Sequence, residues 1–434
     1  MENPKTVAEQ LYFAAVGGAD PAAAVAAHTD ELRARYQKEG FHRLLVCGFG
    51  KAAILMAEAL ERALGDLIDS GFIITKYGHG PSANLEKIRL MEAGHPIPDA
   101  NGVRGAEEVI RLTRSADART LLVALISGGG SALCVAPAAG IALADKQRTT
   151  DLLLRAGADI GELNCVRKHL SCIKGGRLAE LLYPATAVAL LLSDVIGDRL
   201  DVIASGPTAP DRTTFADALA VLKNYRLLRA APRSVVELLT RGKAGEIPET
   251  PKEGNPVFHS VTNIIIGSLP TALAAAEKAA DRVGLKTEIL SAQMAGEARE
   301  AGRWLAHKAI AVRATCKDQL PLCLLAGGET TVTVAGAGKG GRNTELALAF
   351  AMEIEGCGGI TLLSAGTDGG DGPTDAAGAL VDGSTIPLAR NLGLDPATFL
   401  RDNDSYSFFE KSGGLFKTGP TGTNVMDIQI IILT

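Results

Sequence analysis

The sequence predicts an α/β protein of two domains, and three observations support this prediction. The chain has 434 residues, which is more than one ordinary domain of about 100–200 residues. Hydrophobic residues make up 47% and charged residues 21%, so the composition is that of a globular protein and not of a disordered one. Short, continuous apolar runs alternate with helical segments, which is the pattern of parallel strands covered by helices on both faces.

The N-terminal half contains four apolar runs that predict strands, at residues 43–50, 71–75, 120–126 and 186–194. Asn3-Pro4 and Asp20-Pro21 each place a capping residue before a proline, which is how many helices begin. Further helices are predicted between the strands, over 52–64, over 101–114 with Asp99 as the N-cap, and from Ser131 to about residue 183.

The segment 242–256 interrupts this alternation. It contains three prolines and three glycines among alternating charges, which predicts an exposed linker. We therefore expect an N-terminal domain over residues 1–245 and a C-terminal α/β domain over 256–434. In the second half, strands are predicted at 263–267, 287–290, 321–328, 330–334, 359–369 and 427–433, and helices at 270–284, 295–313 and 343–354.

Charge, cysteine content and hydropathy exclude several classes of protein. Lys and Arg number 44 against 49 Asp and Glu, with no basic block and only 4% aromatic residues, which argues against a nucleic-acid partner. The seven cysteines include no C-x-x-C pair and fit reduced, buried thiols. No apolar run approaches the ~18 residues of a membrane helix, and the N-terminus has no signal-peptide pattern. We expect a soluble cytoplasmic protein without a membrane partner.

Glycine-rich loops follow the predicted strands. Gly48 and Gly50 precede Lys51, and the third strand ends in the run Ser127, Gly128, Gly129, Gly130 and Ser131. Glycine lets a ligand approach the backbone closely, and free backbone N–H groups bind anions. An ordinary strand–helix turn or a flexible turn is the alternative interpretation of each loop. The first loop fits G-x-G-x-x-G/A, but the acidic residue that binds a ribose is missing after the next strand, where Lys76 follows. We therefore expect phosphate or carboxylate ligands here.

Acidic residues stand at two other strand ends. Asp194 and Asp198 follow the fourth strand, where they could hold Mg²⁺ or accept a proton. Thr367, Asp368 and Asp371 form a similar cluster, for which a plain Asp-Gly turn is a strong alternative. Carboxylates that face glycine loops favour a metal–phosphate site.

Basic residues form two further candidate clusters. Asn164, Arg167 and Lys168 lie on a predicted helix beside a glycine break, and a solvated basic helix surface is an equally good interpretation. Arg342 and Asn343 stand in a glycine turn at a helix start, where a guanidinium can bind a carboxylate or phosphate through two hydrogen bonds. Glu329 follows another predicted strand, in Ala326-Gly-Gly-Glu-Thr-Thr331.

Seven stretches, in this order, resemble the class II glycerate 2-kinase family, whose C-terminal part is the MOFRL domain. They are CGFGKAA, SGGGSAL, LNCVRKHLSCIKGGRLA, LLLSDVIGDRLDVIASGPTAPD, AGGETTVTV, GGRNTELALA and SAGTDGGDGPTDAAGA. The resemblance runs from about residue 41 to 382. Cys165 is the one evident departure, because the family more often has a threonine or a similar small residue there.

The resemblance implies a larger Rossmann-like parallel-sheet domain and a smaller MOFRL-type α/β domain, with the active site in the cleft between them. It implies phosphoryl transfer from ATP, with Mg²⁺, to the 2-hydroxyl of D-glycerate, giving 2-phospho-D-glycerate. Lys51 and Arg342 match positions regarded as active-site residues in the family. We expect Lys51, Asp194 and Arg342 to be catalytic, with D-glycerate and ATP as partners and a homodimer as one expected assembly.

Two other functions compete with this one. Relatives have often been labelled hydroxypyruvate reductase, which would transfer hydride from NAD(P)H. The missing acidic residue after the second strand and the number of phosphate-type loops argue against it. A non-catalytic small-anion binding protein would need the loops but not the carboxylates of Asp194 and Asp368.

Overall fold

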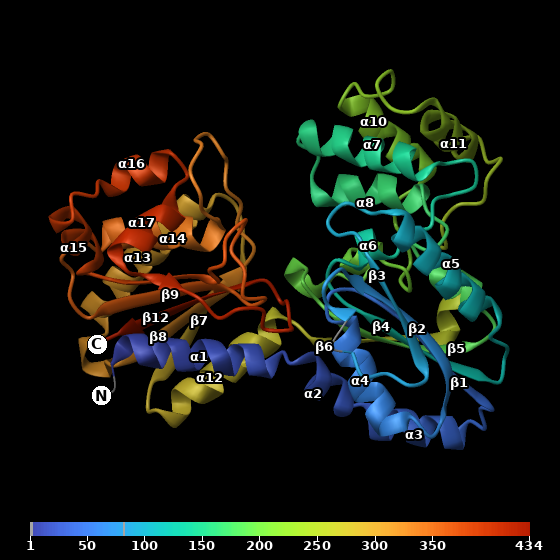
Figure 1. Cartoon of the computed structure of the whole chain (residues 1–434), viewed down its shortest axis with the longest axis horizontal. Coiled ribbons are helices and arrows are strands. Elements are labelled where there is room, and N and C mark those ends of the chain that lie inside the picture. Colours follow the sequence, from blue (N-terminus) through green and yellow to red (C-terminus); the bar gives the residue numbers. More distant parts are fainter. Residues whose placement is uncertain (1–2, 81–82) are drawn as a thin grey trace. The chain divides into compact units, whose positions relative to one another are not determined.

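The computed structural model describes residues 3–80 and 83–434, which divide into two compact units (Figure 1). The N-unit is Pro21–Ile266. The C-unit consists of Gly267–Thr434 together with the residues up to Asp20. Each unit is an α/β domain around a six-stranded sheet. The predicted fold class is therefore confirmed, whereas an active site in a cleft between domains stays a prediction.

The N-unit sheet has the strand order β3-β2-β1-β4-β5-β6. β1 pairs in parallel with both β2 and β4, and the pairs β2–β3 and β4–β5 are parallel too. β4 is buried along its whole length, as its continuous apolar sequence predicts. This order reverses between β1 and β4, which is the place where doubly wound sheets bind ligands. The strands are β1 Arg43–Phe49, β2 Ile68–Lys76, β3 Ile88–Ala93, β4 Thr120–Ile126, β5 Thr186–Leu192 and β6 Val261–Gly267.

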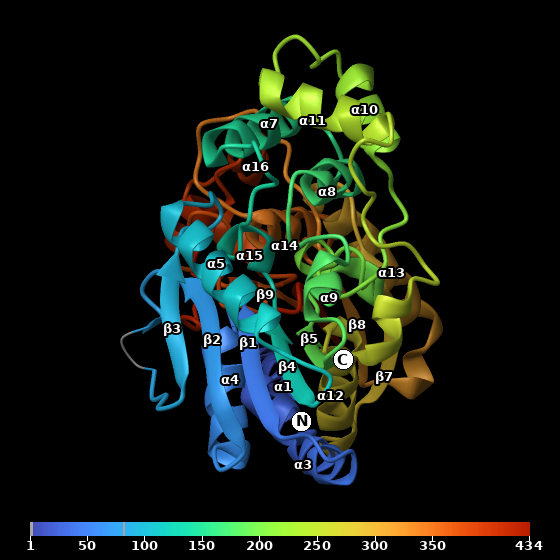
Figure 2. The same ribbon diagram turned by 90° about the vertical axis from the view of Figure 1, so that its right-hand side faces the viewer.

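Helices of the N-unit cover the sheet and also build a cluster of their own. α7, α8, α10 and α11 share a core that includes Leu163, Phe215 and Leu239, and Figures 1 and 2 show this cluster beyond one end of the sheet. A capping box at Asp159 fixes the start of α8. The helices are α2 Pro21–Ala26, α3 Thr29–Lys38, α4 Ala53–Leu64, α5 Ala100–Arg114, α6 Gly130–Leu133, α7 Leu143–Arg155, α8 Ile160–His169, α9 Arg177–Leu182, α10 Phe215–Asn224 and α11 Arg233–Lys243.

The C-unit sheet is mixed and has the order β11-β10-β9-β12-β8-β7. β12 runs antiparallel to both β8 and β9, whereas β7 and β8 are parallel. Its strands are β7 Lys286–Met294, β8 Leu322–Gly328, β9 Ile360–Gly366, β10 Gly378–Asp382, β11 Leu415–Phe416 and β12 Asp427–Leu433. Its helices are α1 Pro4–Gly18, α12 Leu269–Arg282, α13 Ala298–Thr315, α14 Arg342–Glu353, α15 Thr385–Asn391, α16 Pro396–Arg401 and α17 Ser405–Ser412.

The division into units differs from the expected boundary in two places. α1 lies with α12 against the C-unit sheet, and the Tyr12 hydroxyl donates to the Gly366 carbonyl at 2.7 Å. Residues 242–256 are part of the N-unit and do not join the two units. Thr250 is buried there and donates to Asp211 at 2.9 Å. The chain passes between the units twice, between Asp20 and Pro21 and again at the end of β6, which is the edge strand of the first sheet.

The strand expected at residues 330–334 is wrong. Thr331 makes only an isolated bridge with Glu297, and the Thr333 amide donates to the Glu297 carboxylate instead of to a strand. Val334 is 73% exposed. The alternation of threonine and valine resembles a half-buried strand, but no sheet covers its apolar side.

Candidate functional site

The loops after β1 and β4 meet where the strand order reverses. Phe49 and Ile126 are paired residues at the ends of these strands. The amide of Lys51 donates to the Gly128 carbonyl at 2.9 Å, and the Ser127 hydroxyl accepts from the Ala52 amide at 3.1 Å. Gly50 has φ +138°, and a Cβ there would lie 2.1 Å from the Ser127 hydroxyl oxygen. The two predicted glycine loops are therefore one structure, which only glycine at position 50 permits.

Two backbone donors of this structure remain available to a ligand. Among the described residues, the N–H groups of Gly128 and Gly129 donate to no backbone carbonyl, whereas the Gly130 N–H donates to the Ser127 carbonyl. Adjacent, unused N–H groups in a turn attract anions. The expected anion-binding role thus falls on Gly128 and Gly129, because the amide of Lys51 is already bonded within the loop.

Three side chains lie against the same glycines. A Cβ on Gly128 would be 2.2 Å from Asp194 Oδ2, and a Cβ on Gly129 would be 2.9 Å from the His95 ring and 3.4 Å from Lys51 Cγ. Lys51 and Asp194 were predicted from the sequence, and the structure brings them to one loop. His95 was not predicted. Burial, with the nearby Lys51 charge, lowers the pKa of His95 to about 4, so its imidazole is neutral at pH 7.

A chain of polar side chains supports the loop from within. The Lys174 ammonium group donates to the Ser131 carbonyl at 2.6 Å and to its hydroxyl at 2.8 Å. The Ser131 and Ser205 hydroxyls are 2.8 Å apart, and Ser205 donates to Asn164 Oδ1 at 2.9 Å. Asn164 therefore supports the loop. Lys174 and Ser205 were not among the predicted site residues, although both lie in stretches that carry the resemblance.

The neighbouring Lys168 lies in a different environment. It is buried, and its ammonium group donates to Asp211 at 3.1 Å. His169 lies beside it, with Nε2 3.2 Å from a Glu249 carboxylate oxygen. These partners favour a structural role for Lys168 rather than the predicted contact with substrate or phosphate.

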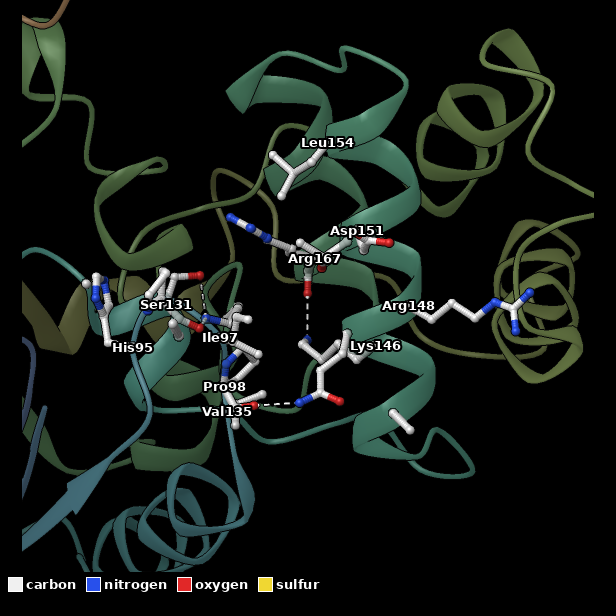
Figure 3. A pocket seen from close by; sticks show the side chains of 17 residues that line it. His95, Ile97, Pro98, Ser131, Val135, Lys146, Arg148, Asp151, Leu154 and Arg167 are labelled. Carbon is white, nitrogen blue, oxygen red and sulfur yellow. Dashed lines mark hydrogen bonds between the residues drawn. The ribbon is translucent and has the colours of Figure 1, made fainter. Parts of the chain in front are cut away.

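A pocket of about 770 Å³ begins at the glycine loop (Figure 3). Gly129, Ser131 and His95 line one side, and α7 lines the other with residues that include Lys146 and Leu154. The Arg167 side chain also lines the pocket, as do Lys174 and the loop Pro96–Pro98. The pocket lies wholly within the N-unit.

The carboxylates after β5 fit a magnesium ion. Mg²⁺ is usually held by one or two carboxylates together with phosphate oxygens and water. The Asp194 side chain lies against the glycine loop at Gly128. Asp198 Oδ1 is buried without a hydrogen-bond partner among the described residues. The residues described include no group of three or more His, Cys, Asp or Glu side chains that could hold a metal by themselves. A metal at Asp194 and Asp198 would therefore depend on ligand oxygens.

In the C-unit, Arg342 begins α14 between two carboxylates. Nε and a terminal nitrogen donate to Asp427 at 2.5 and 2.9 Å, and the other terminal nitrogen donates to Glu329 at 2.6 Å. Burial raises the pKa of Asp427 to about 6, although the charge of Arg342 acts in the opposite direction. Asp427 was not predicted as a site residue, because it begins the last predicted strand, whereas the candidates were sought where strands end.

Most of the remaining candidates in the C-unit have partners that indicate structural roles. Both Asp371 oxygens accept from backbone N–H groups at the start of α14, at 2.8 Å each, so Asp371 caps this helix. Asn343 accepts from the Ser364 hydroxyl at 2.8 Å. Thr367 donates to the Met426 carbonyl, and Asp368 accepts from the Gly370 amide within the predicted turn. These contacts favour the turn alternative over a ligand contact at Asp371 and Thr367.

Fold and site together define a two-domain α/β protein with an anion-binding loop where a doubly wound sheet reverses its strand order. Residues 7–240 match the family described as a domain of unknown function, DUF4147, and residues 322–427 match the MOFRL family. The D-glycerate 2-kinase of Thermotoga maritima is 45% identical over 397 residues, 91% of each chain. The chain belongs to this glycerate 2-kinase family.

Two further comparisons cover nearly the whole chain. A protein of Agrobacterium vitis named putative hydroxypyruvate reductase is 42% identical, covering 99% of this chain and 94% of its own. The crystal structure of a glycerate kinase from Thermotoga maritima superposes with a TM-score of 0.88 at 42% identity, covering 99% of both chains. No helix in the described residues is long and apolar enough to cross a membrane.

Proposed function

We propose that this protein transfers the γ-phosphoryl group of ATP to the 2-hydroxyl of D-glycerate and forms 2-phospho-D-glycerate. The observation that carries the proposal is the convergence of Lys51, His95 and Asp194 on the loop where the N–H groups of Gly128 and Gly129 are bonded to no described backbone carbonyl. Phosphoryl transfer depends mainly on positioning and on charge stabilisation, and this loop offers donors, a cation and a carboxylate together.

The residues around the loop have separate roles in this proposal. The Lys51 ammonium group and the two glycine N–H groups stabilise the charge of the transferring phosphoryl group. Asp194 orients the attacking hydroxyl or accepts its proton. Asp194 and Asp198 would hold Mg²⁺, which neutralises phosphate charge when it is bound. His95 stays neutral and donates or accepts a hydrogen bond beside the loop.

Arg342 is assigned to the glycerate carboxylate. Asp427 is buried and holds two nitrogens of the guanidinium group, which fixes the plane of the group. Glu329 is more exposed and binds a third nitrogen. A substrate carboxylate can replace Glu329 on the exposed side, because Arg342 keeps its orientation through Asp427.

Hydroxypyruvate reduction is the alternative function. The observation in its favour is the name of the Agrobacterium vitis relative, putative hydroxypyruvate reductase. The strand order β3-β2-β1-β4-β5-β6 also occurs in dinucleotide-binding domains. A carboxylate for the ribose hydroxyls is expected at the end of β2, but Lys76 ends this strand. The alternative is therefore the weaker of the two.

Two assays on the purified chain test the proposal. With D-glycerate and Mg-ATP, we expect ADP release and a product that enolase consumes directly, because enolase acts on the 2-phosphate and not on the 3-phosphate. With hydroxypyruvate and NADH or NADPH, we expect no oxidation of the cofactor. Cofactor oxidation at enzymatic rates without ADP release in the first assay would overturn the proposal in favour of the reductase.

A further inference from the structure

The pocket of about 770 Å³ in the N-unit has an apolar mouth and a basic floor. The mouth is formed by Ile97 and Pro98 on one side and by Leu154 of α7 on the other (Figure 3). The floor is formed by Lys146, Arg167 and Lys174, and it leads to the glycine loop at Gly129 and Ser131.

The mouth exposes large apolar side chains that no other described residue covers. Ile97 is 69% exposed and Leu154 is 56% exposed, and both line the pocket. Exposed apolar surface gathered at a cavity is typical of a ligand contact, whereas a single exposed side chain is ordinary. Gln147 donates to the Pro98 carbonyl at 2.7 Å, which fixes the Ile97 loop to α7 and holds the mouth open at a defined width.

Arg167 supplies positive charge to the floor, and no carboxylate among the described residues neutralises it. The Arg167 guanidinium group has no hydrogen-bond or ion-pair partner within residues 3–80 and 83–434. Lys146 donates only to the carbonyls of Arg167 and Leu170, and Lys174 donates only to Ser131. Asp151 is the one acidic residue that lines the pocket, and it already pairs with Arg155 at 2.9 Å. Figure 3 shows the Arg148 side chain directed away from the floor.

We propose that this pocket is the nucleotide site, with the base between Ile97 and Leu154 and the phosphate chain along Arg167 and Lys174 toward Gly129. The assignment rests on the proposed function, which requires a phosphoryl donor. A base supplies a flat apolar face for the mouth, and a polyphosphate supplies the negative charge that the floor lacks. The end of the phosphate chain then lies at the loop that Lys51 and Asp194 contact.

The size and polarity of the pocket argue against D-glycerate as its occupant. Pockets of about 300–1,000 Å³ enclose ligands of drug or cofactor size. D-glycerate has only three carbon atoms and no apolar face, so it would fill a small part of the space and leave Ile97 and Leu154 uncovered. A nucleotide satisfies the mouth and the floor at the same time.

The experiment compares Leu154→Gln and Ile97→Gln with the control Leu388→Gln in the full chain. Leu388 is 56% exposed, as Leu154 is, but it lies on α15 of the C-unit. Calorimetry measures the binding of ADP and of inorganic tripolyphosphate to each protein, without glycerate. We expect both pocket variants to bind ADP at least tenfold more weakly and tripolyphosphate within twofold of the wild type, and the control to bind both normally.

A second variant tests the floor. Arg167→Met is expected to weaken the binding of both ADP and tripolyphosphate by at least tenfold, because the substitution removes a contact with the phosphates and not with the base. Unchanged ADP binding in Leu154→Gln and Ile97→Gln would overturn the inference, and so would a rise in the KM for D-glycerate with an unchanged KM for ATP. A different outcome would overturn the proposed function alone. In it, the wild type binds ADP, the pocket variants weaken this binding, and the wild type phosphorylates no D-glycerate.

Discussion

The Lys174 ammonium group holds Ser131 by two hydrogen bonds, one to the backbone carbonyl at 2.6 Å and one to the hydroxyl at 2.8 Å. Lys174 is buried, and its burial lowers its pKa well below the usual value for lysine. Since Ser131 ends the glycine loop, this contact fixes the loop and not only the serine.

Lys174→Met should therefore loosen the loop as well as the fold. Leaving the Ser131 carbonyl without its donor is expected to lower the free energy of unfolding by about 1–3 kcal/mol and to raise the KM for ATP at least tenfold. Denaturant titration and initial rates measure the two effects. The matched control is Lys168→Met, an equally buried lysine paired with Asp211. It should lose stability but keep the wild-type KM for ATP, and a similar rise there would contradict the specific role of Lys174.

Gly129→Ala should impair activity more than Gly140→Ala. Both glycines are left-handed, with φ +80° and +82°, so alanine adds a similar strain of about 1–2 kcal/mol at each. A Cβ meets the His95 ring 2.9 Å away at Gly129, but meets nothing within 4 Å at Gly140. We expect kcat/KM for ATP to fall at least tenfold in the first variant and less than threefold in the second. Equal losses would show that the His95 contact does not matter.

Asp194→Asn should lower kcat by at least ~100-fold, because an amide neither accepts a proton nor balances the charge of a metal. The control is Asp66→Asn, which removes an exposed carboxylate that pairs with Arg33. Steady-state rates at saturating ATP and D-glycerate measure the effect. Turnover close to that of the wild type in the Asp194 variant would exclude it as base and as metal ligand, and Asp198 would then be examined in the same way.

Lys51→Ala and Arg342→Lys should affect different kinetic constants. Lys51→Ala should chiefly lower kcat, because its contact strengthens as the phosphoryl group is transferred. Arg342→Lys keeps the charge but loses the planar pair of donors, and we expect the KM for D-glycerate to rise roughly tenfold or more. Arg299→Lys is the control for Arg342, because Arg299 also donates through two nitrogens to a buried carboxylate, to one oxygen of Glu345. If Arg342→Lys raised the KM for ATP and left the KM for D-glycerate unchanged, the roles of Lys51 and Arg342 would have to be exchanged.

Nucleotide binding should take up protons above pH 7 through Lys146. Burial and the nearby Arg167 lower the pKa of Lys146 to about 7, and the Cys172 and Lys174 side chains also lie close to it. The free protein therefore carries a largely neutral Lys146 at pH 8, and a bound polyphosphate raises its pKa and favours protonation. Calorimetry with ADP at pH 8, in buffers of different ionisation enthalpy, measures the uptake. Lys146→Met should abolish most of it, and an unchanged uptake would assign it to another group.

The same depressed pKa makes the stability contribution of Lys146 depend on pH with a definite sign. The unfolded chain binds its proton up to about pH 10.5, whereas the folded chain releases it from about pH 7 upward. Protonation therefore opposes folding, and the stability of the wild type relative to Lys146→Met should rise between pH 7.5 and 9.5, by about 1 kcal/mol per pH unit.

The sequence by itself determined the strands and the loops that form the N-unit site. β4 is a continuous apolar run because both of its faces are buried, and the glycine loops after β1 and β4 can be recognised in the sequence because their turns allow no side chain at Gly50 or Gly129. Helix starts were equally local: Asn3 and Asp99 accept from backbone N–H groups within three residues, as predicted. Lys51, Asp194 and Arg342 were predicted as site residues because each adjoins such a signal.

Only the tertiary structure decided which polar groups meet. Asp427 pairs with Arg342 across 85 residues and Lys174 with Ser131 across 43, and nothing near Asp427 or Lys174 in the sequence specifies the partner. Tertiary packing also placed α1 in the C-unit, because its apolar face is complementary to α12 and to the second sheet, and not to the strands that follow it. Local sequence patterns reflect the structural requirements of the turn, strand or helix in which a residue lies. Contacts between distant segments depend on where the whole chain brings them, which periodicity and spacing do not encode.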